Sequence, residues 1–107
     1  MSQLDVLWGS TLRNIRLDLV RLEVELTIDV PHEGSAADRH MLTVAGLGSL
    51  AFENSIPDPW TYAEVTEARA VRNGELIALE LILWSEEAQL RVSGRRAWLD
   101  GVEIAGE

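Results

Sequence analysis

The sequence predicts an all-β protein, an antiparallel β-sandwich or open barrel of six to eight strands, formed by residues 1–107 as a single β domain. Three observations support this fold. Apolar and polar residues alternate along several segments, Asn-Gly and Asp-Gly pairs separate some of them, and hardly any stretch has the 3.6-residue period of a helix. A chain of this length can bury one hydrophobic core without disulfides.

The first strand signal is the segment of residues 16–30, RLDLVRLEVELTIDV. Apolar residues fill the even positions from 20 to 30 but the odd positions from 15 to 19, so the pattern slips by one residue at Leu19-Val20. An unbroken strand over residues 15–30 would span roughly 50 Å, which exceeds a normal strand. Because no Gly or Asn marks a hairpin, we expect one long strand, bent by a β-bulge at Leu19-Val20, that sends both apolar sets into one core. A tight turn is the alternative.

Seven further strands are expected downstream, at residues 41–45, 50–52, 65–71, 76–84, 88–92, 97–99 and 102–104. Gly46 and Gly48 indicate a bulge or a second hairpin after the first of these strands, and Gly94 a kink near the end of another. A short helix over residues 61–69 is the alternative for that stretch.

Two turn signals fix the neighbourhood of the later strands. Asn73-Gly74 predicts a hairpin with a type I′ turn, and Asp100-Gly101 predicts a second two-residue turn. Residues 76–84 are apolar at both parities except for Glu80, which is typical of a central strand covered on both faces, and Trp84 is expected in the core.

Composition narrows the function classes. The chain has 18 acidic residues against nine basic ones, all of them Arg, for a net charge of -9, and no cysteine. An anionic surface disfavours nucleic acid and acidic lipid and favours a basic protein partner. The absent cysteine, and the lack of a signal peptide or an apolar stretch of membrane-spanning length, predict a soluble cytoplasmic protein.

Candidate chemical sites in the sequence are weak. Residues 46–51 match the dinucleotide fingerprint G-x-G-x-x-A, but no amphipathic helix follows, so we reject it. His32 and His40 bracket a loop that could hold a metal, yet loop histidines are ordinarily surface residues, and no metal or other cofactor is predicted. Glu80 is expected to form a structural ion pair with Arg69 or Arg91 rather than to catalyse. No catalytic residue is assigned.

The best candidate for a binding surface is an acidic, aromatic segment at residues 58–64. Asp58, Trp60, Tyr62 and Glu64 combine aromatic anchors with carboxylates, as protein-binding hot spots do. The alternative is that Trp60 plugs the open end of the β structure.

Three pieces of the chain carry a resemblance to a known group of proteins: Gly9-Ser10 with the long strand signal of residues 12–30, Pro59 to Tyr62, and residues 79–85, LELILWS. With these pieces the chain resembles small uncharacterised bacterial β-rich domains, some of which act as immunity proteins of polymorphic toxins. The resemblance implies a non-catalytic protein-binding role toward a basic partner and assigns no catalytic residue. The alternative is a small-molecule or carbohydrate binding module with an aromatic-lined pocket. The oligomeric state, a homodimer included, stays open.

Overall fold

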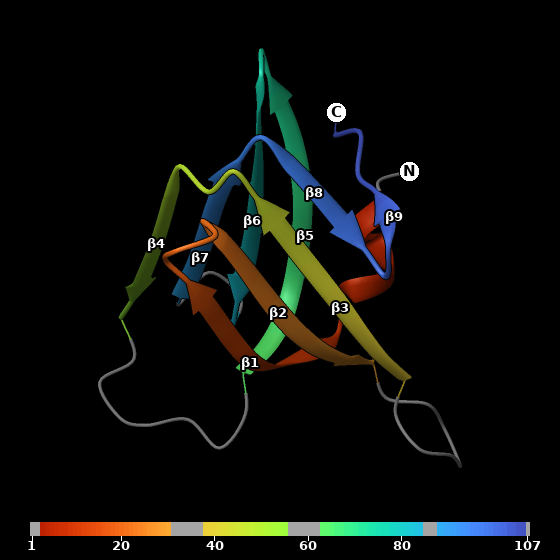
Figure 1. The fold of residues 1–107 in the computed structure, drawn as a ribbon. Helices are drawn as coiled ribbons and strands as arrows, with labels where there is room; N and C mark the ends of the chain where they lie inside the picture. Colours follow the sequence, from red (N-terminus) through yellow and green to blue (C-terminus); the bar gives the residue numbers. More distant parts are fainter. Residues whose placement is uncertain (1–2, 31–37, 56–62, 85–87, 107) are drawn as a thin grey trace.

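The protein is almost entirely β-structure, as the computed structural model shows for residues 3–30, 38–55, 63–84 and 88–106. Nine strands form one antiparallel sheet in the order β4-β7-β6-β5-β1-β2-β3-β8-β9, which is not closed (Figure 1). The elements are η1 (a 3-10 helix, Gln3–Leu7), β1 (Ser10–Asp18), β2 (Glu23–Val30), β3 (Asp38–Ala45), β4 (Ser49–Asn54), β5 (Ala63–Asn73), β6 (Leu76–Leu83), β7 (Ala88–Gly94), β8 (Arg96–Leu99) and β9 (Val102–Glu103). The all-β prediction is confirmed, with one strand more than expected. No helical segment of the described residues has the length and apolar character needed to cross a membrane.

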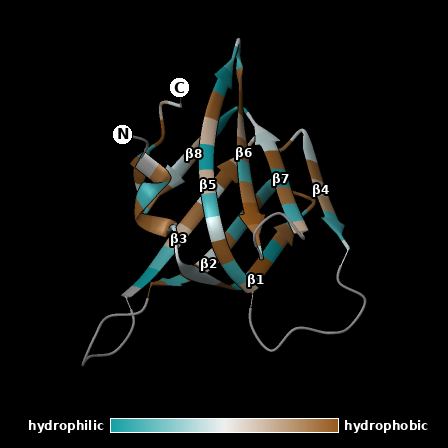
Figure 2. Ribbon diagram, turned by 180° about the vertical axis from the view of Figure 1, so that it is seen from behind, coloured by the Kyte–Doolittle hydropathy of each residue, from teal (hydrophilic) through white to brown (hydrophobic). Residues whose placement is uncertain are grey.

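The sheet is curled over on itself into two layers. In Figure 1 the β1-β2-β3-β8 part lies in front of the β5-β6-β7-β4 part, and Figure 2 shows the same layers from behind. Hydrophobic and hydrophilic residues alternate along the strands in Figure 2, because one face of each strand is turned inward. The inner faces bury an aliphatic core whose largest members are Leu4, Leu7, Val24, Leu26, Ile28, Leu42, Ile77, Leu79, Leu81, Leu83, Leu90 and Ile104.

The expected long bent strand is wrong: residues 10–30 form a hairpin of two strands. β1 ends at Asp18, residues 19–22 turn, and β2 starts at Glu23. The turn forms without Gly or Asn because Asp18 Oδ1 accepts hydrogen bonds from the backbone N of Val20 and Arg21, both at 3.0 Å. The apolar residues therefore change from odd to even positions because the chain reverses its direction at residues 19–22. A β-bulge does occur, but at residues 12–14 within β1.

The two layers are joined at a corner where β3 runs into β4 and β7 runs into β8. Backbone hydrogen bonds cross this corner from Gly48 N to Ser93 O at 2.8 Å and from Arg95 N to Ala45 O at 3.0 Å. A Cβ on Gly94 would lie 2.6 Å from Cγ1 of Val44, closer than real side chains approach. The predicted kink at this position therefore depends on glycine, since only hydrogen fits between the strands.

Both predicted hairpins are present, but one turn differs in type. Asn73 is the last residue of β5 and pairs with Leu76, so the turn residues are Gly74 and Glu75. Only Gly74 has a positive φ, of 64°, which fits a type II′ turn and not the predicted type I′ turn. In the β8–β9 turn, by contrast, both central residues have positive φ, as type I′ requires.

The structure settles three other expectations about the later part of the chain. Residues 63–69 belong to β5, so the alternative of a helix there is wrong. β6 is covered on both faces only in its second half, because its first half alternates between buried and exposed residues. Trp84, which follows β6, is partly buried and packs against the core.

The edge of β5 that faces away from β6 is covered by the two ends of the described chain. The indole nitrogen of Trp8 donates a hydrogen bond to Ala68 O at 3.0 Å, and Gly9 N donates to Val65 O at 2.7 Å. Farther along β5, Nε of Arg72 donates to Ala105 O at 3.4 Å. This edge is therefore protected against pairing with other strands.

Candidate functional site

The predicted partner-binding residues lie mostly outside the described part of the chain. Asp58, Trp60 and Tyr62 belong to residues 56–62, which the structure does not describe, and Glu64 is half-buried in β5. The acidic, aromatic surface therefore stays a prediction. So does the choice for Trp60 between partner contact and a plug.

Only one of the two histidines of the suggested metal site, His40, lies among the described residues. His32 lies outside the described residues, whereas Nδ1 of His40 is 2.5 Å from Oδ2 of Asp100. The other oxygen of Asp100 accepts a hydrogen bond from Met41 N at 2.8 Å. Partial burial alone would raise the pKa of Asp100, but the hydrogen bonds from Met41 and His40 outweigh it and hold that pKa below its usual value. This contact ties the β8–β9 turn to β3, and no group of three potential metal-ligating side chains occurs among the described residues.

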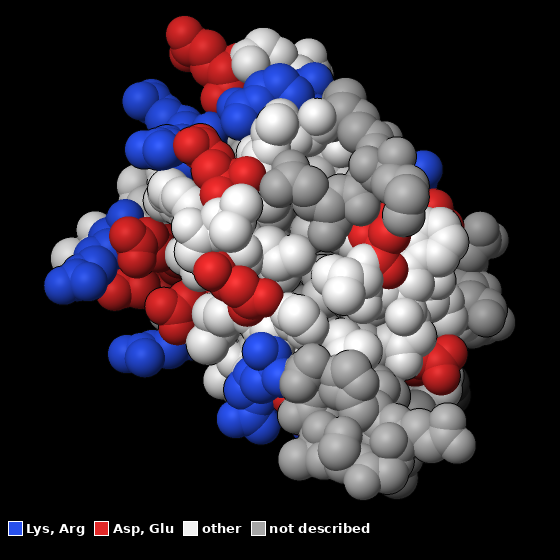
Figure 3. All heavy atoms as spheres, turned by 90° about the vertical axis from the view of Figure 1, so that its right-hand side faces the viewer, with Lys and Arg blue, Asp and Glu red and all other residues white. Residues whose placement is uncertain are grey.

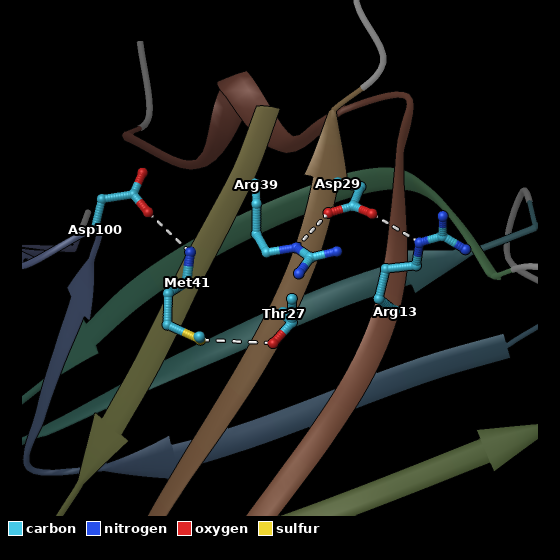
Figure 4. Close-up of polar contacts among 6 residues, drawn as sticks. All are labelled: Arg13, Thr27, Asp29, Arg39, Met41 and Asp100. Carbon is cyan, nitrogen blue, oxygen red and sulfur yellow. Dashed lines mark hydrogen bonds and ion pairs between the residues drawn. The ribbon is translucent and has the colours of Figure 1, made fainter. Parts of the chain in front are cut away.

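A cluster of one carboxylate and two guanidinium groups lies on the outer face of β1, β2 and β3. Figure 4 shows Asp29 between Arg13 and Arg39, with a distance of 2.7 Å from Arg13 Nε to Oδ2 and 3.0 Å from Arg39 Nε to Oδ1. The hydrogen bonds from Arg39 and Arg13 lower the pKa of Asp29. Because both carboxylate oxygens are occupied by fixed cations, this group is suited to holding three strands together and not to proton transfer.

Glu80 forms the predicted ion pair. Its Oε1 lies 2.7 Å from Nη2 of Arg69, and its Oε2 lies 3.7 Å from Nε of Arg91. All three side chains lie on the outer face of β5, β6 and β7, so the carboxylate is partly hydrated and is not buried in the core. The geometry is that of a surface ion pair, which adds little to stability.

Charged side chains of both signs are interspersed on the face that Figure 3 shows. Acidic and basic groups alternate along one side of this view, and the rest of the face is mostly uncharged with isolated carboxylates. Many of the charges are paired, as in the contact of 2.9 Å between Arg96 and Glu103. The net charge of -9 thus does not produce one continuous acidic patch on this face.

The most unusual surface of the described chain is the tip of the β1–β2 hairpin. We call residues 15–22 the apolar hairpin. Its five large apolar side chains are exposed to 39% (Ile15), 42% (Leu17), 70% (Leu19), 95% (Val20) and 49% (Leu22). Isolated exposed apolar residues are ordinary, but five of them on one short hairpin make it a candidate interaction site, because large exposed apolar patches are typical of such sites. Sequence reasoning missed it by assigning all five of these residues to the core.

The exposure follows from where the strands stop pairing. Ile15 and Leu17 lie opposite Leu26 and Val24, so they face the same side of the sheet as these two core residues. However, β1 pairs with β5 only through its residues 10–12. Beyond that point no described strand lies on this side of β1, and residues 13–17 are all exposed.

The turn of the apolar hairpin is built from residues that suit neither a turn nor an exposed position. None of Leu19, Val20, Arg21 and Leu22 is a typical turn former. Leu22 has a φ of 55°, a left-handed conformation that costs a residue with a Cβ roughly 1 kcal/mol. Breaks of local sequence rules occur preferentially at functional sites. A signal in the sequence was Asp18, since an Asp side chain can accept hydrogen bonds from the backbone two and three residues later.

A shallow depression on the outer face of β4, β7, β6 and β5 is the described candidate for a small-molecule site. It has a volume of about 260 Å³ and is lined by both apolar and polar side chains, among them Val71, Leu79, Val92, Glu80 and Arg91. This volume lies just below the range of about 300–1,000 Å³ of ligand pockets. None of its lining residues is aromatic, so it does not match the aromatic-lined pocket expected for a ligand-binding module.

Comparisons with known proteins inform the fold. No protein-family model and no curated protein matches the sequence. A crystal structure of an uncharacterized protein from Neisseria gonorrhoeae is similar to this chain, with a TM-score of 0.69 and 6% sequence identity over 87% of this chain and 91% of that one. The curled all-β architecture is therefore shared with a solved protein over nearly the whole length of both chains.

Proposed function

We propose that this chain is a non-catalytic protein-binding domain whose contact surface is the apolar hairpin. The observation that carries the proposal is the exposure of five large apolar side chains on one short hairpin. Burying such a group against a partner removes apolar surface from water at about 25 cal/mol per Å². Because the same residues contribute little to the core and strain the turn, binding is the role that accounts for them.

The charges around the hairpin define what the partner offers at the contact. Arg16 and Arg21 project from the apolar hairpin, and neither forms an ion pair with another described residue. A partner surface with apolar side chains bordered by carboxylates would complement them. At longer range the net charge of -9 favours encounter with a basic partner, in line with an immunity-like role in which the domain covers its target.

The described carboxylates support a non-catalytic role. Asp29 and Glu80 are each held by two arginine side chains. Asp100 is held by the imidazole of His40 and the backbone N of Met41. A general acid or base needs access to a substrate and a pKa near the working pH. We place this activity in the cytoplasm, since a chain without cysteine has no need of an oxidising compartment.

The test compares two surface variants as immobilised bait in extracts of the native cell. The double substitution Leu19→Ser with Val20→Ser removes the two most exposed apolar groups of the apolar hairpin. The control, Val102→Ser, removes an apolar group that is 63% exposed on the distant strand β9. We expect the control to capture the same protein as the wild type and the hairpin variant to lose it. Capture that survives the hairpin substitutions would refute the proposed surface.

A further inference from the structure

We propose that the partner of the apolar hairpin is a second copy of this chain, which pairs its β1 antiparallel to the first β1 and joins the two sheets into one. The inference rests on the proposed function, because it uses the same surface. It names the partner at that surface as a second copy, in place of the basic target that an immunity-like role requires, and it adds the geometry of the contact. Figure 1 shows β1 at the margin of its layer, where a further strand would extend the β3-β2-β1 series.

The first argument is the open backbone edge of β1. Residues 14–18 pair with β2 on one side and with no described strand on the other. By contrast, the edge of β5 is covered by Trp8 and by the segment around Ala105. Natural sheets protect edges that must not pair, whereas an uncovered edge with exposed apolar side chains is a template for another strand.

The second argument is that the sequence of this edge complements itself. The segment Ile15-Arg16-Leu17-Asp18-Leu19, read antiparallel to a second copy about a two-fold axis at Leu17, places each Arg16 opposite the Asp18 of the other copy. It also places Leu17 opposite Leu17 and Ile15 opposite Leu19. Opposite charges then meet on the outer face and apolar groups meet on the inner face, as a stable strand pair requires.

Neighbouring registers lack this match. A two-fold axis perpendicular to a sheet leaves every side chain on the face where it started. Residues that lie opposite each other must face the same side, which happens only when the axis passes through a residue position. An axis at Arg16 would put two guanidinium groups against each other. An axis at Asp18 would put two carboxylates against each other. The register centred on Leu17 is therefore the one in which the charges of the edge are complementary.

The third argument is a like-charge pair inside the hairpin. Asp18 lies directly opposite Glu23 in the β1–β2 register, and like charges in this position destabilise a strand pair. An Arg16 from the second copy would lie on the other side of Asp18 and offset this repulsion. The net charge of -9 on each copy opposes dimerisation, but charges farther apart than about 8 Å are largely screened at physiological ionic strength.

The test uses the absence of cysteine from the natural chain. In the proposed register Leu17→Cys places two thiols directly opposite each other, with Cα atoms about 5 Å apart, within the range for a disulfide. Ile15→Cys is the matched control, on the same strand and face and with similar exposure, but its two copies would lie about 13 Å apart. Under mild oxidation we expect at least tenfold more disulfide-linked dimer from Leu17→Cys. Equal yields from both variants, or more from Ile15→Cys, would overturn the pairing.

Sedimentation of the cysteine-free chain gives an independent measure. We expect the average mass to rise toward that of a dimer between about 1 and about 500 µM, the range in which small interfaces dissociate. Arg16→Asp should raise the dimer Kd about tenfold, and Arg21→Asp, which makes the same charge change outside the pairing, should alter it less than about twofold. A chain that stays monomeric throughout would overturn the inference. If that monomer still captures another protein through the apolar hairpin, the proposed function stands without it.

Discussion

The close packing at the corner between the two layers predicts that a single added methyl group there strongly lowers the stability of the fold. Gly94→Ala adds a Cβ that would lie 2.6 Å from Cγ1 of Val44 and 2.8 Å from the backbone oxygen of Ala45. The backbone oxygen of Ala45 cannot yield without moving β3, and overpacking of this kind costs about 1–3 kcal/mol. For a domain of this size, each kcal/mol lowers Tm by roughly 4–8 °C, so we expect a loss of about 4–24 °C.

Gly48→Ala is the matched control for this prediction. Gly48 lies in the same corner, and a Cβ there would come no closer than 3.7 Å to Ser93 O, which is an ordinary contact. Neither glycine has a positive φ, so the two variants differ in space and not in backbone strain. Tm would be measured by far-UV circular dichroism at one protein concentration, since dimerisation makes Tm depend on concentration. If both variants melt at the same temperature, the close approach at Gly94 does not hold the layers together.

Three further predictions concern the hairpins and the outer face. Gly74→Val forces a branched side chain into a φ of 64° and should lower the free energy of unfolding by about 1–2 kcal/mol; an unchanged Tm would contradict the turn geometry. The two guanidinium groups that hold Asp29 lower its pKa in the folded protein. The stability that this contact adds is therefore complete above the pKa of the unfolded chain, near 3.9, and is lost as the pH falls through the lower pKa of the folded state. Urea titrations should therefore find Asp29→Asn less stable than the wild type at pH 7 and the difference vanishing in acid, whereas a constant difference would refute it. Leu19→Ser and Val20→Ser should each change the free energy of unfolding by less than about 1 kcal/mol, because both side chains are exposed. Leu26→Ser, at a fully buried position, should lower it by about 3 kcal/mol or more. Comparable losses in all three variants would show that the tip of the hairpin is part of the core.

The sequence was sufficient to predict the fold class because the alternation of apolar and polar residues persists in the structure. In β2, Val24, Leu26 and Ile28 are fully buried as their parity predicts. The Asp100-Gly101 turn also follows from local chemistry alone, since both residues adopt the positive φ that this pair favours. Local patterns of this kind need no knowledge of distant neighbours.

Sequence reasoning failed where the outcome depended on which strands are neighbours. The apolar parity of Ile15 and Leu17 is that of core residues, but β5 leaves β1 after three residues, so nothing in the described chain covers them. The cover of the β5 edge depends on Trp8 reaching Ala68, which is 60 residues away. Contacts of such sequence separation cannot be read from hydrophobic period.

The turn of the apolar hairpin was not predicted for a different reason. The absence of Gly and Asn favoured a bulge over a turn at residues 19–22 and left the turn as the alternative. In the structure the side chain of Asp18 supplies the hydrogen bonds of the turn, and Leu22 adopts an unfavourable φ. This conflict between local preference and observed structure is one reason for the proposal that the turn binds a partner.

Amide hydrogen exchange of residues 13–18 tests the central claim most directly, because it reports whether the open edge of β1 becomes paired. If this edge binds another strand, exchange of its outward-facing amides should slow markedly as the protein concentration rises, while the amides of β9 stay unchanged. Rapid exchange of the β1 edge at every concentration and in the presence of any captured partner, with protection arising on another surface instead, would contradict the account.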